Sequence, residues 1–168
     1  MTYSYSPIST RLDKPLAHCA DEPVASLIDE IFESSSEAVQ HTLLSQLVAK
    51  VYEVAAPQER KRMLEQLMMP MGVLSLVAVA NGIFAKIRFR SGWQGENVRL
   101  EDAQMVAPSD VAALVNHVQQ VSVDAVNGLT AMITASPVLT ASASAALLLK
   151  ILLRRAQRRR STDHELNP

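Results

Sequence analysis

The 168-residue sequence has few aromatic residues, a single cysteine and almost no net charge, and the last two of these shortages each exclude a class of protein. One cysteine cannot form an internal disulfide or a cysteine-cluster metal site, which rules out a disulfide-stapled secreted scaffold and a zinc finger. A formal net charge of −1 removes the simplest case for a nucleic-acid binder, a uniformly basic domain. The five glycines form no GxxxxGKS/T, GxGxxG or GxSxG motif, so neither a phosphate-binding loop nor a nucleophile elbow is present.

A secretory signal is also lacking, because residues 1–16 are polar, contain two prolines and include no apolar run. We therefore expect a cytoplasmic protein. Two windows without charge, 66–85 and 125–149, reach the roughly twenty residues that a membrane span needs. Prolines, glycines or hydroxyl residues interrupt both windows, and cations follow each of them. Two consecutive spans would place those cations on opposite sides of the membrane, against the positive-inside tendency. We expect both to lie in a helical core, with a single span near the C-terminus as the alternative.

Apolar residues recur at spacings of three and four through most of the chain, which is typical of amphipathic helices. Three helices are predicted between Asp21 and Met68, separated by the serines at 34–36 and by Ala56-Pro57. The clearest helix covers 109–135, because Pro108-Ser109-Asp110 supplies a cap and a negative first turn.

The segment 73–106 has an ambiguous periodicity. Asn81-Gly82 favours a β-hairpin because both residues accept the positive φ of a type I′ turn, and apolar and polar residues alternate over 83–90. Residues 97–106 would then add a third short strand. The rival interpretation is a long buried helix over 71–89.

These patterns predict a mainly α, single-domain helical bundle of about five helices over residues 21–160. A small antiparallel hairpin or sheet around 73–106 is the open alternative. A flexible lead is expected over 1–20 and a disordered tail over 161–168. Residues 137–160 are expected to form a C-terminal helix that is apolar first and basic afterwards.

The near-zero net charge conceals a strongly uneven distribution. Residues 13–59 hold nine acidic and two basic residues, a net charge of −7. Residues 150–160 hold no acidic residue and a net charge of +6. The predicted docking cations are Lys150, Arg154, Arg155, Arg158, Arg159 and Arg160.

This basic segment has four interpretations. The first is the solvated end of a packed helix, where cations are favourable. The second is an anchor on an anionic membrane, with each cation contributing about 1 kcal/mol to membrane binding. The third is a phosphate-binding tail for nucleic acid. The fourth interpretation is a contact with the acidic N-terminal helix, within the chain or on a neighbouring subunit.

A second basic and aromatic patch is predicted at Lys86, Arg88, Arg90 and Trp93, where the indole would stack on a nucleobase or lie at a lipid headgroup layer. The alternative is a loop tryptophan folded over the core. The histidines are scattered, so no metal site, cofactor or small-molecule substrate is expected.

We therefore predict a non-enzymatic, bacterial-type interaction or scaffold protein that self-associates as a homo-oligomer. Its basic C-terminal helix would dock on an anionic membrane surface or an acidic protein partner. A nucleic-acid-binding regulator that uses the same arginines is the alternative. An enzyme with an unrecognised site around His117 and Trp93 is the second alternative.

Overall fold

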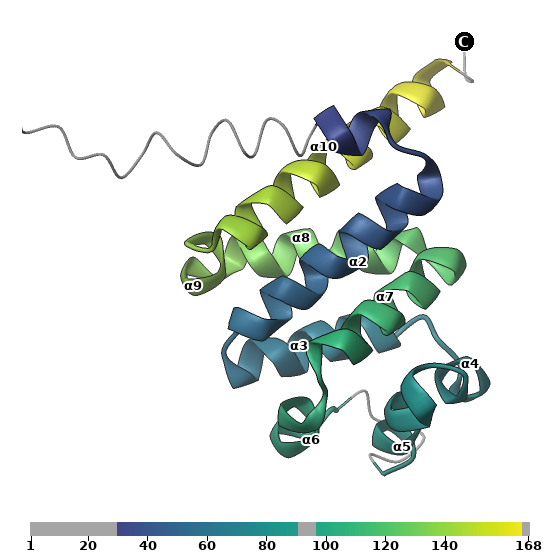
Figure 1. The fold of residues 1–168 in the computed structure, drawn as a ribbon, viewed down its shortest axis with the longest axis vertical. Coiled ribbons are helices and arrows are strands. Elements are labelled where there is room, and N and C mark those ends of the chain that lie inside the picture. The colour runs from purple at the N-terminus through teal and green to yellow at the C-terminus, as the bar shows by residue number, and fades with distance from the viewer. Residues whose placement is uncertain (1–29, 91–96, 166–168) are drawn as a thin grey trace, which may run out of the picture.

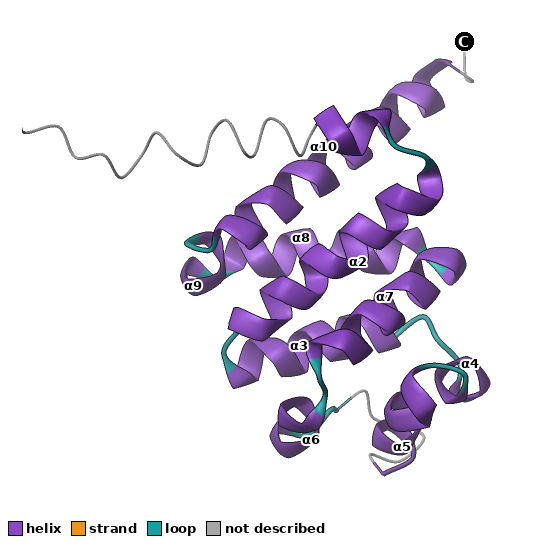
Figure 2. Ribbon diagram, in the orientation of Figure 1, coloured by secondary structure: helices purple, strands orange, loops and turns teal. Residues whose placement is uncertain are grey.

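The structure, a computed structural model, describes the backbone of residues 30–90 and 97–165 and the side chains of 30–90 and 97–158. Within those ranges every regular element is a helix and no strand forms (Figure 2). A helical stretch at 30–34 comes first. The elements that follow are α2 (Glu37–Val54), α3 (Pro57–Met68), α4 (Val73–Val77), the 3-10 turn η1 (Ala80–Gly82), α5 (Ile83–Arg90), α6 (Leu100–Met105), α7 (Pro108–Val121), α8 (Val123–Ala135), α9 (Pro137–Thr140) and α10 (Ala143–Glu165).

The long helices form a bundle in which α2 is central (Figure 1). Helices α10, α2 and α7 lie side by side, and α8 packs against α10, α7 and α3. The short helices α4, α5 and α6 gather at one end of the bundle, where α6 contacts α3. The predicted mainly α bundle is confirmed, although the described part of the chain contains shorter and more numerous helices than the five expected.

The core is a cluster of aliphatic and methionine side chains, with residues from every α-helix between α2 and α10. Two aromatic side chains, Tyr52 and Phe84, are fully buried within it. Glycine brings two of these helices close together, because a Cβ on Gly128 of α8 would lie 2.5 Å from the side-chain amide nitrogen of Gln66 on α3.

Proline and an acidic residue begin two of the core helices in the same way. Pro57 and Pro108 occupy the first turns of α3 and α7, where a missing N–H leaves no hydrogen bond unmade. Two residues after each proline, the carboxylates of Glu59 and Asp110 accept the N–H groups of Ala56 and Ala107 at 3.1 and 3.2 Å. The predicted starts of both helices are thus confirmed to within a residue.

The predicted β-hairpin in 73–89 is wrong. Asn81 and Gly82 do have positive φ, at 56° and 73°, but they join the helices α4 and α5 instead of two strands. Helical spacing decides the burial, since Phe84 and Ile87 are buried whereas Phe89 is 63% exposed. Ala80 also has a positive φ of 48°, which costs about 1 kcal/mol in a residue with a Cβ.

Three other predicted elements differ from the structure. The third strand expected over 97–106 is replaced by the helix α6, and the single helix expected over 109–135 is divided into α7 and α8 at Ser122, whose φ of −153° is extended. The helix expected over 137–160 is divided into α9 and α10, and α10 continues to Glu165. The predicted lead over 1–20 lies outside the described residues.

The two charge-free windows are both divided among several helices. The window 66–85 runs from α3 through α4 and η1 into α5, and the window 125–149 from α8 through α9 into α10. Over the ranges that the structure covers, none of the helices combines the length and the apolar character needed to cross a bilayer.

Tyr52 links α2 to the end of α6 in the core. Its fully buried phenol donates a hydrogen bond to the carbonyl of Ala103, one of the last carbonyls of α6, which have no helical partner. The pKa of Tyr52 is raised to about 12, mainly because the phenol is buried. The nearby charge of Asp110 also raises this pKa, whereas the guanidinium of Arg60, which lies 5.3 Å from the ring centroid, lowers it.

This pKa predicts a loss of stability at alkaline pH. Because the phenol keeps its proton longer in the folded chain than in the unfolded one, its contribution is complete below pH 10.0 and decreases as the pH rises toward about 12. The variant Tyr52→Phe is expected to be less stable by about 1–2 kcal/mol at pH 7, since the Ala103 carbonyl loses its donor. Urea unfolding of the parent and the variant at pH 7 and above pH 10 measures the free energy of unfolding of each. If the Tyr52→Phe variant loses as much stability at alkaline pH as the parent does, the phenol is not the cause of the loss.

Candidate functional site

Helix α10 carries the basic cluster, and the first half of this helix is anchored in the core. Its buried residues Ala145, Leu148, Ile151 and Leu152 follow helical spacing, and the helix packs against α2 and α8. Each buried Leu or Ile contributes about 1.5–3 kcal/mol relative to an exposed one. The apolar half therefore fixes the position of the basic half.

The predicted docking cations begin where this apolar stripe ends. Lys150, Arg154 and Arg158 are exposed, with 47% and 63% of the two arginine side chains accessible, and Arg155 is partly buried. The helix continues through positions 159 and 160, whose side chains lie outside the described residues. In Figure 1 the basic end of α10 projects beyond the helices that pack against its first half.

Glu33 joins this basic end to the start of the described chain. Its Oε1 accepts from Nη1 of Arg154 at 2.7 Å and lies 2.9 Å from Nη2 of Arg158. The two arginines are four residues apart and therefore share one face of α10. Among the four interpretations of the basic segment, the contact with the acidic N-terminal part of the chain is the one that these pairs match, and they lie within one chain.

Gln40 holds the segment that carries Glu33. Its side-chain Nε2, on α2, donates to the carbonyls of Phe32 at 2.8 Å and of Ser35 at 3.1 Å. These bonds fix the bend between 30–34 and α2. Glu33 is therefore placed against α10 by backbone contacts that do not involve its own carboxylate.

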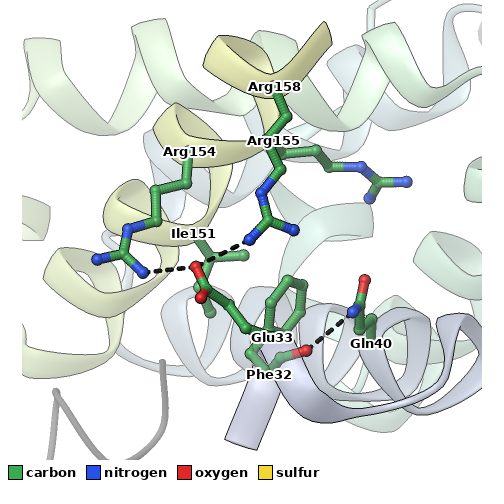
Figure 3. Close-up of a pocket in the computed structure, with 7 residues that line it drawn as sticks. All are labelled: Phe32, Glu33, Gln40, Ile151, Arg154, Arg155 and Arg158. Carbon is green, nitrogen blue, oxygen red and sulfur yellow. Dashed lines mark hydrogen bonds and ion pairs between the residues drawn. The ribbon is translucent and has the colours of Figure 1, made fainter. Parts of the chain in front are cut away.

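A small open pocket of about 50 Å³ lies between the two segments, and Figure 3 shows its lining. Arg154 and Arg158 converge on Glu33 in this view, whereas the Arg155 side chain extends away from it. The lining residues are Phe32, Glu33, Gln40, Ile151, Arg154, Arg155 and Arg158.

The members of the second predicted patch have separate environments. Nη1 of Arg88 donates to the carbonyls of Met68, at 3.0 Å, and Met71, so this side chain satisfies groups at the end of α3. Arg90 pairs with Asp102, Lys86 is exposed, and Trp93 lies outside the described residues. Two of the cations predicted to bind nucleic acid or lipid thus support the fold.

Asp102 is a carboxylate that the sequence analysis did not single out and that the structure buries. Only 1% of its side chain is accessible; Oδ1 lies 2.5 Å from Nη1 of Arg90, and Oδ2 is buried with no hydrogen-bond partner among the described residues. The Arg90 side chain is 49% accessible, so its cation links a buried carboxylate to solvent. Helical spacing would have found this site, since Asp102 and Ala103 lie on the inner face of α6.

The second alternative placed a catalytic site around His117 and Trp93. His117 is partly buried on α7, and Trp93 lies outside the described residues. Over the described part of the chain, no cluster of His, Cys, Asp and Glu side chains is arranged to hold a metal ion.

Comparison with known proteins leaves this geometry as the basis for assigning a function. No protein-family model, curated protein or solved structure matches the chain. The feature that distinguishes the molecule is the basic end of α10, anchored in the core at one side and paired with Glu33 at the other.

Proposed function

We propose that this chain is a non-enzymatic, self-associating interaction protein that docks on an anionic membrane surface through the basic end of α10. The observation that carries the proposal is the division of α10 into a buried apolar half and an arginine-rich half in which Arg154 and Arg158 are exposed. A helix anchored in this way holds its cations in one place on the surface. Leu153, which is 50% exposed beside Arg154, adds an apolar side chain to the docking face.

A membrane surface suits this arrangement better than nucleic acid does. The segment 150–160 carries six cations and no acidic residue, and each cation near an anionic leaflet contributes about 1 kcal/mol. A nucleic-acid interface would gain from a second basic patch, but Arg88 and Arg90 already serve the fold. The proposal therefore places docking on α10 alone.

Vesicle flotation tests the proposal with a variant that leaves the pocket intact. We expect Lys150→Gln/Arg159→Gln/Arg160→Gln to lower affinity for phosphatidylserine-containing vesicles by about 100-fold, since three cations are lost. The matched control Lys50→Gln/Arg62→Gln/Lys86→Gln removes three cations from α2, α3 and α5 and is expected to bind like the parent. Equal binding by all three proteins would refute the proposal, as would salt-sensitive binding to DNA alone. Light scattering on the same samples measures self-association.

A further inference from the structure

The end of the bundle formed by α4, α5 and α6 exposes several large apolar side chains. Leu74 on α4 is 88% exposed, more than any other large apolar residue in the part of the chain that the structure describes. Exposed apolar residues gathered in one region of a protein typically mark an interaction site. We call this surface the apolar end and define it by residues that are each 49–88% exposed: Met69, Leu74, Val77, Phe89 and Met105.

Contacts between the short helices bring these residues into one region. The helices α4 and α5 pack against each other, and Arg88 of α5 donates to two carbonyls at the end of α3. Arg90 of α5 pairs with Asp102 of α6. Leu74 and Val77 are three residues apart and share one face of α4. The apolar end is therefore a surface of packed elements, and the same elements hold it in place.

The charges around the apolar end suit a second copy of the same chain. No charged residue lies between Glu65 and Lys86, and residues 66–107 hold four basic and three acidic residues, a net charge of +1. Two such surfaces do not repel each other strongly, and a strongly charged partner gains little from either.

Two exposed side chains of opposite sign make this surface self-complementary. Lys86 lies one helical turn from Phe89 on α5, and Glu101 lies one turn from Met105 on α6. Within the described ranges neither Lys86 nor Glu101 has an ion-pair partner. In a two-fold interface the same surface of both copies meets, so the cation of one copy can face the acid of the other.

We propose that two copies of the chain pair through their apolar ends in a two-fold interface. This interface names the surface that the self-association in the proposed function would use, so it rests on that function. Pairing removes Leu74, Val77 and Phe89 from water, which is the main driving force for association. An anionic membrane is a less suitable occupant, because the guanidinium groups of Arg88 and Arg90 at this end already bond to groups of α3 and α6.

The position of the apolar end gives the pair a further property. In Figure 1, α4, α5 and α6 lie at the lower end of the longest axis, and the basic end of α10 lies at the upper end. Two copies that meet at their apolar ends therefore direct their basic ends away from each other. Such a pair binds two anionic surfaces at once, whereas a single copy binds one. The paired protein would thus act as a bridge between two membranes.

An interface variant and a matched control test the pairing in the full chain. Leu74→Ser/Val77→Ser is expected to raise the Kd of the pair, measured by sedimentation equilibrium, by at least about 30-fold, because each substitution occurs twice in a two-fold interface. Val121→Ser/Val138→Ser removes two side chains that are 53% and 62% exposed on α7 and α9, and is expected to leave Kd within about twofold. Unchanged urea midpoints establish that both variants are folded.

Charge reversal tests the two-fold arrangement. Lys86→Glu and Glu101→Lys each place like charges across the interface, and each is expected to raise Kd by about tenfold. The double variant restores opposite charges and is expected to return Kd to within about threefold of the parent. A double variant that pairs no better than either single variant would overturn this arrangement.

Vesicle clustering measures the bridge. The parent and the Val121→Ser/Val138→Ser control are expected to cluster phosphatidylserine-containing vesicles, as followed by dynamic light scattering. Leu74→Ser/Val77→Ser is expected to float with the vesicles and leave them single.

Three results would overturn the pairing. The parent could remain monomeric up to about 0.1 mM, where even a weak pair forms; the interface variant could pair like the parent; or it could lose flotation where the parent is monomeric, which would place lipid on the apolar end. Pairing without flotation would refute membrane docking and leave the interface intact. Flotation by a strictly monomeric parent would refute the interface and leave docking intact.

Discussion

A chain that ends at Ser136 is expected to lose cooperative unfolding, whereas a chain that ends at Leu153 is expected to keep it. The shorter chain lacks Leu139, Leu148, Ile151 and Leu152, each no more than 2% exposed, whose burial contributes together about 6–12 kcal/mol. This is comparable to the whole stability of an ordinary domain, about 5–15 kcal/mol. The longer chain keeps all four of these side chains and loses the pairs of Glu33 with Arg154 and Arg158, which are exposed and contribute about 0–1 kcal/mol each.

Urea unfolding followed by circular dichroism distinguishes the two chains. A sharp transition for the chain that ends at Ser136 would show that α10 is dispensable for the core, against the burial observed. The chain that ends at Leu153 is also the better tool for studying docking, because it removes the arginines from 154 onward while the buried half of α10 remains. Deleting the whole of α10 would confuse loss of docking with loss of fold.

Arg90→Leu is expected to destabilise the protein by about 2–3 kcal/mol, because it leaves the Asp102 carboxylate buried without its cation. We expect a smaller loss of stability than for a fully buried ion pair, since the Arg90 side chain is half accessible and water reaches it. Arg99→Leu removes an exposed cation at the start of α6 and is expected to change stability by less than about 0.5 kcal/mol.

A second substitution separates the charge effect from lost packing. Asp102→Asn in the Arg90→Leu background removes the uncompensated charge and is expected to recover at least half of the lost stability. Urea midpoints of the parent, of Arg90→Leu, of Asp102→Asn and of the double variant form a double-mutant cycle. Full additivity in that cycle would mean that Arg90 stabilises through its aliphatic stem and not through the ion pair.

Local patterns placed the starts of α3 and α7 to within a residue, because a proline and an acidic residue begin each of these helices. Most apolar residues of α7 and α8 that recur at spacings of three and four are buried in the structure, whereas Val121 is 53% exposed. The segment 73–90 failed for a physical reason. Asn81-Gly82 favours positive φ, and both a hairpin turn and the left-handed link between α4 and α5 need positive φ. Only the tertiary packing of Phe84 and Ile87 distinguishes the helical link from the hairpin.

The candidate site was predicted by charge and refined by packing. The excess of arginine over 150–160 located the basic end of α10, and the acidic N-terminal half suggested an internal partner. The choice of Glu33 depends on how α10 crosses α2, and the pairing of Arg90 with Asp102 depends on how α5 meets α6. Neither crossing is encoded in a local pattern, so those contacts required the three-dimensional structure.

The central position of α2 has a consequence for synthesis of the chain. Its partner α10 begins 89 residues after α2 ends, at Ala143 against Val54. At translation rates of about 5–20 residues per second, this separation corresponds to roughly 5–20 s. For that time the side of α2 that receives α10 has no partner from its own chain. The nascent protein therefore presents an amphipathic helix to chaperones until translation has passed the last buried leucine of α10.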